Sequence, residues 1–253
     1  MVDLKKILKG SAIMIRVTVW NEYVHELKDE KIKEVYPKGI HEAIADFLGK
    51  EEDIEVKTVY LEMPDCGITD ELLDNTDVLM WWGHIRHHEV PDEIAFKVQR
   101  AVLKGMGFIA LHSAHHSKPF RFLMGTSGNL SWREDGDLER VWFVDPSHPI
   151  VQGVGNGRYF ELPHEEMYGE PFSIPEPDKL ILMGWYEGGE VFRSGCLYQK
   201  EYGKVFYFQP GHESYPTFYN KDVQKILLNA IRYVNPTYRV QSLDCPHVEL
   251  INK

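Results

Sequence analysis

Two short, almost continuously apolar segments constrain the fold of this chain more than any other feature. DVLMWW (77–82) and GFIALH (107–112) lack the polar–apolar alternation of a half-exposed strand, which is typical of strands buried on both faces of a parallel sheet. The segment between them, PDEIAFKVQRAVLKG (91–105), begins with proline and ends with glycine, as helices often do. A strand, a helix and a strand in this order predict a parallel crossover unit.

The rest of the chain extends this alternation and favours one domain over residues 1–253. Residues 125–175 are rich in glycine, proline and charge, and we expect them to form a loop-rich insertion with short strands. The resulting prediction is a doubly wound, flavodoxin-like α/β domain with a mostly parallel sheet flanked by helices. The other expected strands are 12–20, 54–61, 179–186, 191–199 and 203–208, and the other expected helices are 37–50, 69–75 (with Thr69 as N-cap) and 219–234.

Composition excludes several classes of function. The formal net charge of −11 argues against binding to nucleic acid or to anionic membranes. The three cysteines, Cys66, Cys196 and Cys245, have no C-x-x-C spacing, which indicates neither a disulfide framework nor a thiolate zinc site. The first 17 residues have lysines followed by apolar residues, but Arg16 interrupts the apolar run and no small-residue cleavage site follows. We therefore expect a cytoplasmic protein with no membrane segment.

Two histidine triplets follow the two buried strands. HIRHH (84–88) and HSAHH (112–116) both place histidines at i, i+3 and i+4. Because ligands of open α/β sheets bind outside the carboxyl ends of the strands, these imidazoles are expected at one crevice. There they can bind a metal, transfer protons or hydrogen-bond a sugar. A single loop histidine more often bonds backbone or solvent, so we expect only one or two of each triplet in the site.

Further chemistry is expected at three other places. ALHSA (110–114) has the small-x-X-x-small pattern of a sharp strand-to-helix turn, with His112 at its apex and a helix starting near His115. If Ser113 were the apex instead, it would be a candidate nucleophile beside a histidine. QPGHES (209–214) places two polar side chains after the last strand, and FELPHEEMYGEPF (160–172) supplies carboxylates that can join a metal site or an acid–base set.

The order and spacing of these motifs resemble those of the ThuA-like (trehalose utilisation) family, which belongs to the class I glutamine amidotransferase-like superfamily. The resemblance rests on four segments: the strand-to-helix turn, or elbow, ALHSA (110–114), HPI (148–150), EEMY (165–168) and YGKVFYFQPGHE (202–213). It covers the chain from the first predicted strand to the last helix. It implies an amidotransferase-like α/β fold and a role in the catabolism of a disaccharide or an oxidised sugar.

The resemblance also assigns residues. The amidotransferases of the superfamily carry cysteine at the apex of a G-x-C-x-G elbow, where this chain has His112, so glutamine amidotransferase activity is not expected. His212 and Glu213 resemble the late histidine–glutamate pair of the superfamily. Glu166 and Tyr168 match an acid-Glu-x-Tyr pattern of the family, in which Glu165 is the first, acidic residue.

We expect a metal-dependent sugar isomerase, lyase or hydrolase that uses His/Glu acid–base chemistry on a disaccharide or keto sugar. The expected cofactor is a divalent metal ion, zinc first, although manganese, iron or nickel also suits such ligands. We also expect a homo-oligomer. The expected metal ligands are His84, His112, Glu166 and His212; the expected catalytic groups are His112, Glu166, His212, Ser113 and Glu213; and the expected substrate contacts are Trp82, His88, His115, His116 and Tyr168.

Two alternatives use the same residues differently. The first is a non-catalytic sugar-binding or sensing domain on an amidotransferase-like scaffold without the elbow cysteine, with tryptophans stacked on sugar rings. The second is a structural metal clamp built from the histidine triplets. A binding module has no need of so many groups that titrate near neutral pH, so the enzyme is the preferred hypothesis.

Overall fold

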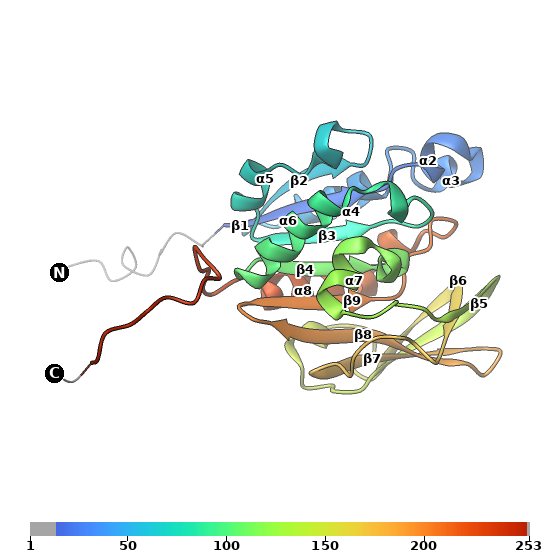
Figure 1. Ribbon diagram of the computed structural model, residues 1–253. Helices are drawn as coiled ribbons and strands as arrows, with labels where there is room; N and C mark the ends of the chain where they lie inside the picture. The colour runs from blue at the N-terminus through green and yellow to red at the C-terminus, as the bar shows by residue number, and fades with distance from the viewer. Residues whose placement is uncertain (1–13, 252–253) are drawn as a thin grey trace, which may run out of the picture.

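One large mixed sheet forms the centre of the protein. The computed structural model describes residues 14–251, and within them nine strands pair in the order β2-β1-β3-β4-β9-β8-β7-β5-β6 (Figure 1). Most of the segment considered above as a signal peptide lies outside the described residues. The strands of the parallel half are β1 Ile15–Asn21, β2 Ile54–Tyr60, β3 Val78–Trp82, β4 Gly107–Leu111 and β9 Gly203–Phe208.

The other half of the sheet corrects the prediction of a mostly parallel sheet. Strands β8, β7, β5 and β6 follow β9 through four antiparallel pairings, so the sheet is mixed. The region expected to be loops and short strands contains two of its longest strands. The first half of β5 is largely exposed and carries charged residues and Gly136, and β6 has exposed polar positions in its first half, so both segments imitate loops in the sequence. These strands are β5 Ser131–Phe143, β6 Tyr159–Gly169, β7 Lys179–Tyr186 and β8 Val191–Lys200.

Two hydrophobic cores lie on opposite faces of the parallel half. In β3 the side chains of Met80 and Trp82 enter one core and those of Leu79 and Trp81 the other, which explains why this strand is apolar throughout. The helices α4 Ile40–Leu48 and α8 Lys221–Val234 contribute to the first core. The second core is covered by α5 Asp70–Asp74, α6 Asp92–Leu103 and α7 Lys118–Met124.

The predicted helices and the strands of the parallel half are confirmed, with ends that differ by a few residues. A polar stretch after β1, for which no element was predicted, forms α2 His25–Lys28 and α3 Glu30–Val35. The described residues also include five short 3₁₀ helices: η1 Pro64–Gly67, η2 His87–Glu89, η3 His112–His116, η4 Pro149–Val151 and η5 Thr217–Tyr219. Among the described residues, none of the helices has the length and apolar character that crossing a membrane requires.

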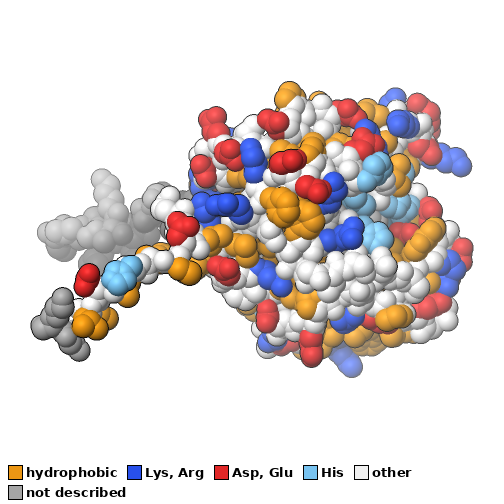
Figure 2. All heavy atoms as spheres, viewed as in Figure 1, with side chains coloured by type: hydrophobic (Ala, Val, Ile, Leu, Met, Phe, Trp, Pro, Cys, Tyr) orange, Lys and Arg blue, Asp and Glu red, His pale blue; other side chains and the backbone are white. Residues whose placement is uncertain are grey.

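The parallel strands all run from the side of the sheet at which β1 begins toward the opposite side (Figure 1). Their carboxyl ends therefore form the opposite edge, where Figure 2 shows histidine side chains gathered on the surface. This edge is where an open α/β sheet binds ligands.

The close approach of β9 to α6 gives a stability prediction. A Cβ atom on Gly203, the first residue of β9, would lie 2.0 Å from the Val102 carbonyl oxygen and 2.7 Å from that of Met106. Gly203→Ala should lower the free energy of unfolding by about 1–3 kcal/mol or more, because backbone cannot move aside as a flexible side chain can. Urea unfolding measures it. Gly49→Ala is the control, since Gly49 has helical φ and its nearest contact would be 3.3 Å; an equal loss there would contradict the prediction.

Candidate functional site

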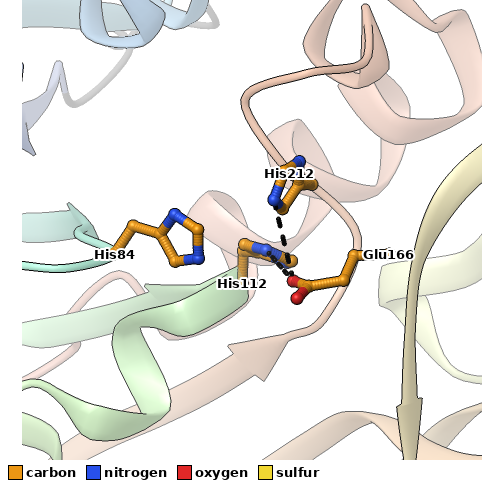
Figure 3. Close-up of side chains that lie close together, drawn as sticks. All are labelled: His84, His112, Glu166 and His212. Carbon is orange, nitrogen blue, oxygen red and sulfur yellow. Dashed lines mark ion pairs between the residues drawn. The ribbon is translucent and has the colours of Figure 1, made fainter. Parts of the chain in front are cut away.

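Three histidines and one glutamate converge at the carboxyl edge of the sheet. His84 follows β3, His112 follows β4, His212 follows β9, and Glu166 lies on β6 (Figure 3). One ligand atom from each lies within 4.8 Å of the other three. His84 is half-buried and the other three side chains are buried. The sequence prediction of these four as one group therefore matches their positions in the structure.

His112 occupies the apex of the predicted turn in a strained backbone conformation. Its φ is 51°, in the left-handed region that costs a residue with a Cβ atom about 1–2 kcal/mol. Its Nδ1–H donates to the Gln209 carbonyl oxygen at 2.9 Å, which leaves Nε2 to face Glu166 Oε2 at 2.9 Å. The helix expected from His115 is instead η3, and α7 starts at Lys118 because Ser117 caps it and Pro119 follows.

The contact between His112 and Glu166 is a buried ion pair. Burial lowers the pKa of His112, but the hydrogen bond with Glu166 and the charges of nearby carboxylates raise it overall. Burial raises the pKa of Glu166, but the hydrogen bond with His112 and the charges of His112, His212 and His84 lower it overall. The proton therefore rests on His112, and a metal that bound both residues would displace it.

Glu213 orients His84. Its Oε1 lies 2.7 Å from His84 Nδ1 and 3.0 Å from His25 Nδ1. Burial opposes ionisation, but the hydrogen bond with His84 and the surrounding imidazoles lower the pKa of Glu213 to about 2. His84 Nδ1 donates to this carboxylate, so Nε2 is the nitrogen left for a ligand, as in the carboxylate–histidine–metal arrangement of many metalloproteins.

A second buried carboxylate, Glu22, holds the loop that carries His84. It accepts hydrogen bonds from the backbone amides of His84 (2.9 Å), Ile85 (3.1 Å) and Arg86 (2.9 Å). Glu22 and His25 were not among the residues predicted from the sequence. The sequence signal for Glu22 was its position directly after the first predicted strand, in the pair NE (21–22). The carboxyl ends of all the parallel strands lie at this edge of the sheet, so a polar residue there is a candidate for the site.

His212 has a different tautomer from His112. Its Nδ1 accepts a hydrogen bond from the Ser214 amide at 3.2 Å, so the neutral ring carries its proton on Nε2. Burial lowers the pKa of His212 to about 4, which keeps the ring neutral near pH 7. The Nε2–H points toward three carboxylates at distances of 3.7, 3.8 and 4.0 Å: Glu213, Glu134 and Glu166.

The loop that carries His212 is held from two sides. The fully buried Glu165 on β6 accepts hydrogen bonds from the amides of Gly211 and His212, both at 3.0 Å, and from the Thr217 hydroxyl at 2.8 Å. From the core, the Trp82 indole N–H donates to the Gly211 carbonyl at 2.9 Å. Trp82 is fully buried, so its assignment as a sugar contact is wrong: this side chain positions backbone.

A pocket of 380 Å³ adjoins the four residues, within the usual size range of small-molecule sites. Tyr168 lines it and bonds Ser113 Oγ at 2.7 Å and His112 Nε2 at 3.3 Å. Burial raises the pKa of Tyr168 well above its usual value, so the phenol keeps its proton. Ser113 pairs with this phenol rather than with a basic nitrogen, which does not support its role as a nucleophile. Trp132, with 65% of its surface exposed, is at the rim.

The other histidines of the triplets lie differently. His115 lines the pocket, but it is buried, donates from Nδ1 to the Gly128 carbonyl at 2.8 Å and packs against aromatic rings. His116 also lines the pocket and bonds Asn129. His88 is 77% exposed and lies outside this pocket.

Comparisons with known proteins identify the family. The family model ThuA, described as trehalose utilisation, matches residues 16–234. No curated protein matches the chain. A putative ThuA-like protein from Parabacteroides merdae is similar in structure, with a TM-score of 0.65 at 13% identity, covering 91% of this chain and 93% of that one.

Two further solved structures are similar. A putative ThuA-like protein from Bacteroides uniformis has a TM-score of 0.64 at 16% identity and covers 89% of this chain and 93% of that one. A glutamine amidotransferase from Thermotoga maritima has a TM-score of 0.51 at 13% identity and covers 86% of this chain and 96% of that one. At such identities these similarities establish the amidotransferase-like fold alone.

The His112–Glu166 pair predicts a pH-dependent stability in chelator-treated protein. The pKa of His112 is raised, so the stabilisation is complete below its usual value of 6.5 and is lost as pH rises through the raised pKa. The pKa of Glu166 is lowered, so acid removes the stabilisation only as pH falls through a value below 4.5. The loss of unfolding free energy in Glu166→Gln should be larger at about pH 5.5 than at about pH 9, by on the order of 1 kcal/mol.

Urea unfolding of both proteins across this range measures the difference. Glu161→Gln is the matched control, because it removes a solvent-exposed ion pair with Arg140. A Glu166→Gln effect that is constant with pH, or that grows toward pH 9, would contradict the prediction.

Proposed function

The chain belongs to the ThuA, or trehalose utilisation, family, and on that premise we propose that it is an enzyme that moves a proton beside the carbonyl of a sugar. The observation that carries the proposal is a set of buried polar atoms in the site. Within the described residues, His212 Nε2 and Glu213 Oε2 are buried without a hydrogen-bond partner. Buried polar atoms are normally paired, so these favour a bound ligand at this point.

We propose a divalent metal ion as part of that ligand, with zinc the first choice. His84 and His112 each have Nδ1 bonded to an oxygen, which leaves Nε2 for a metal, and Glu166 offers a carboxylate oxygen. Two imidazoles and one carboxylate with a fourth position free is the ligand pattern of catalytic zinc. The tautomer of His212 fits a proton donor better than a ligand, so we place it beside the metal.

The metal, when bound, would polarise the carbonyl oxygen of the sugar as a Lewis acid. The other steps belong to side chains. His212 stays neutral near pH 7 and donates its Nε2–H to the oxygen on which negative charge develops. Glu134 lines the pocket, is 46% exposed and is held by the Ser214 hydroxyl at 3.5 Å. It is the pocket carboxylate outside the proposed metal ligands, and we assign it the role of base.

The walls of the pocket suit a sugar. Trp132 offers an aromatic face at the rim, the usual surface for stacking against a pyranose ring, and the Tyr168 phenol can donate to or accept from a sugar hydroxyl. A keto sugar bound here would present an acidic C–H next to its carbonyl. Loss of that proton leads to isomerisation or to elimination of a glycoside.

An enzyme accounts for the site better than a sugar-binding module does. Binding a neutral sugar needs paired hydrogen-bonding groups, whereas this site buries a charged His112–Glu166 pair and a neutral His212 within 4.0 Å of Glu166. Such opposite pKa shifts in neighbouring groups are characteristic of acid–base catalysis.

Metal content tests the ligand assignment. Protein purified without a nickel column should carry about one equivalent of divalent metal by elemental mass spectrometry, and His112→Ala or Glu166→Ala should lose about nine-tenths of it or more. His164→Ala is the control, because His164 is exposed and bonds the Gly136 carbonyl. Wild-type protein without metal would refute the metal assignment and leave the histidines as acids, bases or sugar ligands.

Proton exchange tests the reaction. In D₂O the wild-type protein should exchange the C–H next to the carbonyl of a keto sugar such as singly oxidised trehalose, followed by proton NMR. Glu134→Gln should slow this exchange by about a hundredfold or more, because the amide cannot accept the proton. Glu161→Gln, which alters a distant exposed carboxylate on β6, should exchange at the wild-type rate. Sugar binding without any exchange in the wild type would favour the binding module.

A further inference from the structure

A second cavity adjoins the sugar pocket and differs from it in charge. It has a volume of 490 Å³, and it shares His84, Ile85 and His116 with the sugar pocket. Its remaining walls come from the loop after β3 and from the start of α7 with the loop that follows α7. They are His87, His88, Lys118, Arg121, Ser127 and Asn129.

The lining is basic in an acidic protein. The chain has a formal net charge of −11, yet the residues that line this cavity include two permanent cations and four histidines, with no aspartate or glutamate among them. Figure 2 shows histidine side chains beside Lys and Arg side chains at this edge of the molecule. A concave surface with one sign of charge concentrates ligands of the opposite sign.

Arg121 is the cation that is available to a ligand. Among the described residues its guanidinium has no hydrogen bond or ion pair, and it is exposed. Lys118 is partly neutralised by Asp92, at 2.7 Å. The charge of Arg121 also reaches the histidines of the cavity: burial is the main cause that lowers the pKa of His87 to about 3, and Arg121 adds to it.

Other polar side chains line the same cavity as Arg121. His87 Nε2 is buried and, within residues 14–251, has no hydrogen-bond partner. His116 Nε2 lies 3.2 Å from the Asn129 side-chain oxygen, and Ser127 supplies a hydroxyl. A planar guanidinium with such neighbours matches the geometry of phosphate and carboxylate, which it binds through two parallel hydrogen bonds.

We infer that the substrate of this enzyme is an anionic sugar, whose phosphate or carboxylate group binds Arg121 in this cavity while its carbonyl lies at His112 and Glu166. This inference rests on the proposed function, because the bound anionic sugar is a substrate only if the protein is an enzyme. His84, Ile85 and His116 line both pockets, so the pockets are adjacent and an extended molecule that spans them would contact both.

Calorimetric titration of the protein as purified with inorganic phosphate, at low salt, tests the cavity. Arg121→Gln should weaken phosphate binding by about tenfold or more, because a charged hydrogen bond is lost. Arg158→Gln is the matched control: Arg158 is an exposed arginine on the turn before β6, outside the cavity, and should bind as the wild type does. No phosphate binding by the wild type, or equal binding by Arg121→Gln, would overturn the inference.

Three sugars identify the source of the anion. Glucose 6-phosphate and glucuronate carry a phosphate and a carboxylate, and glucose carries neither. If one or both of the anionic sugars bind more tightly than glucose, and Arg121→Gln abolishes this difference, the inference is supported. The sugar that binds more tightly shows whether the site prefers a phosphate or a carboxylate group. Equal binding of all three, unaffected by Arg121→Gln, overturns it but leaves the proposed function standing, because metal content and proton exchange do not depend on Arg121.

Discussion

The buried carboxylate of Glu165 is the interaction on which the site depends. It lies on β6, in the antiparallel half of the sheet, and binds the amides of Gly211 and His212 in the loop after β9, in the parallel half. Burial raises the pKa of this carboxyl group, and the hydrogen bonds and the charge of His112 oppose that change. Because Glu166 is its neighbour in sequence, one short segment both fixes the His212 loop and delivers the second carboxylate to the site.

Hydrogen bonds to buried oxygen atoms also fix the other loops and rings of the site. Glu22 binds three successive amides of the His84 loop, the Gln209 carbonyl fixes the His112 ring, and Glu213 fixes the His84 ring. Each of the three imidazoles is thus oriented by a hydrogen bond at Nδ1. Where the partner of Nδ1 accepts, the proton lies on Nδ1, and where the partner donates, the proton of the neutral ring lies on Nε2. This separates His84 and His112, which have a free Nε2, from His212, which has an Nε2–H.

Sequence periodicity predicted the parallel half of the sheet because those strands are buried on both faces and are therefore apolar at every position. It missed β5 and β6 as long strands, since the first half of β5 is largely exposed and polar, and the first half of β6 also has exposed polar positions. In the site, counting histidines at strand ends identified His84, His112 and His212. It misassigned Trp82, because a tryptophan at the end of a strand looks the same in sequence whether its indole faces a pocket or a backbone carbonyl in the core.

By itself, the sequence determined the α/β class, the carboxyl edge as the place of the chemistry, the turn at His112 and the absence of an elbow cysteine, because each follows from local pattern and the short range of backbone geometry. Tertiary structure decided which histidines meet, that Glu22, His25 and Glu134 join them, and that a basic cavity with Arg121 opens beside the sugar pocket. These depend on the register and packing of strands far apart in the chain, which hydrophobic periodicity does not encode.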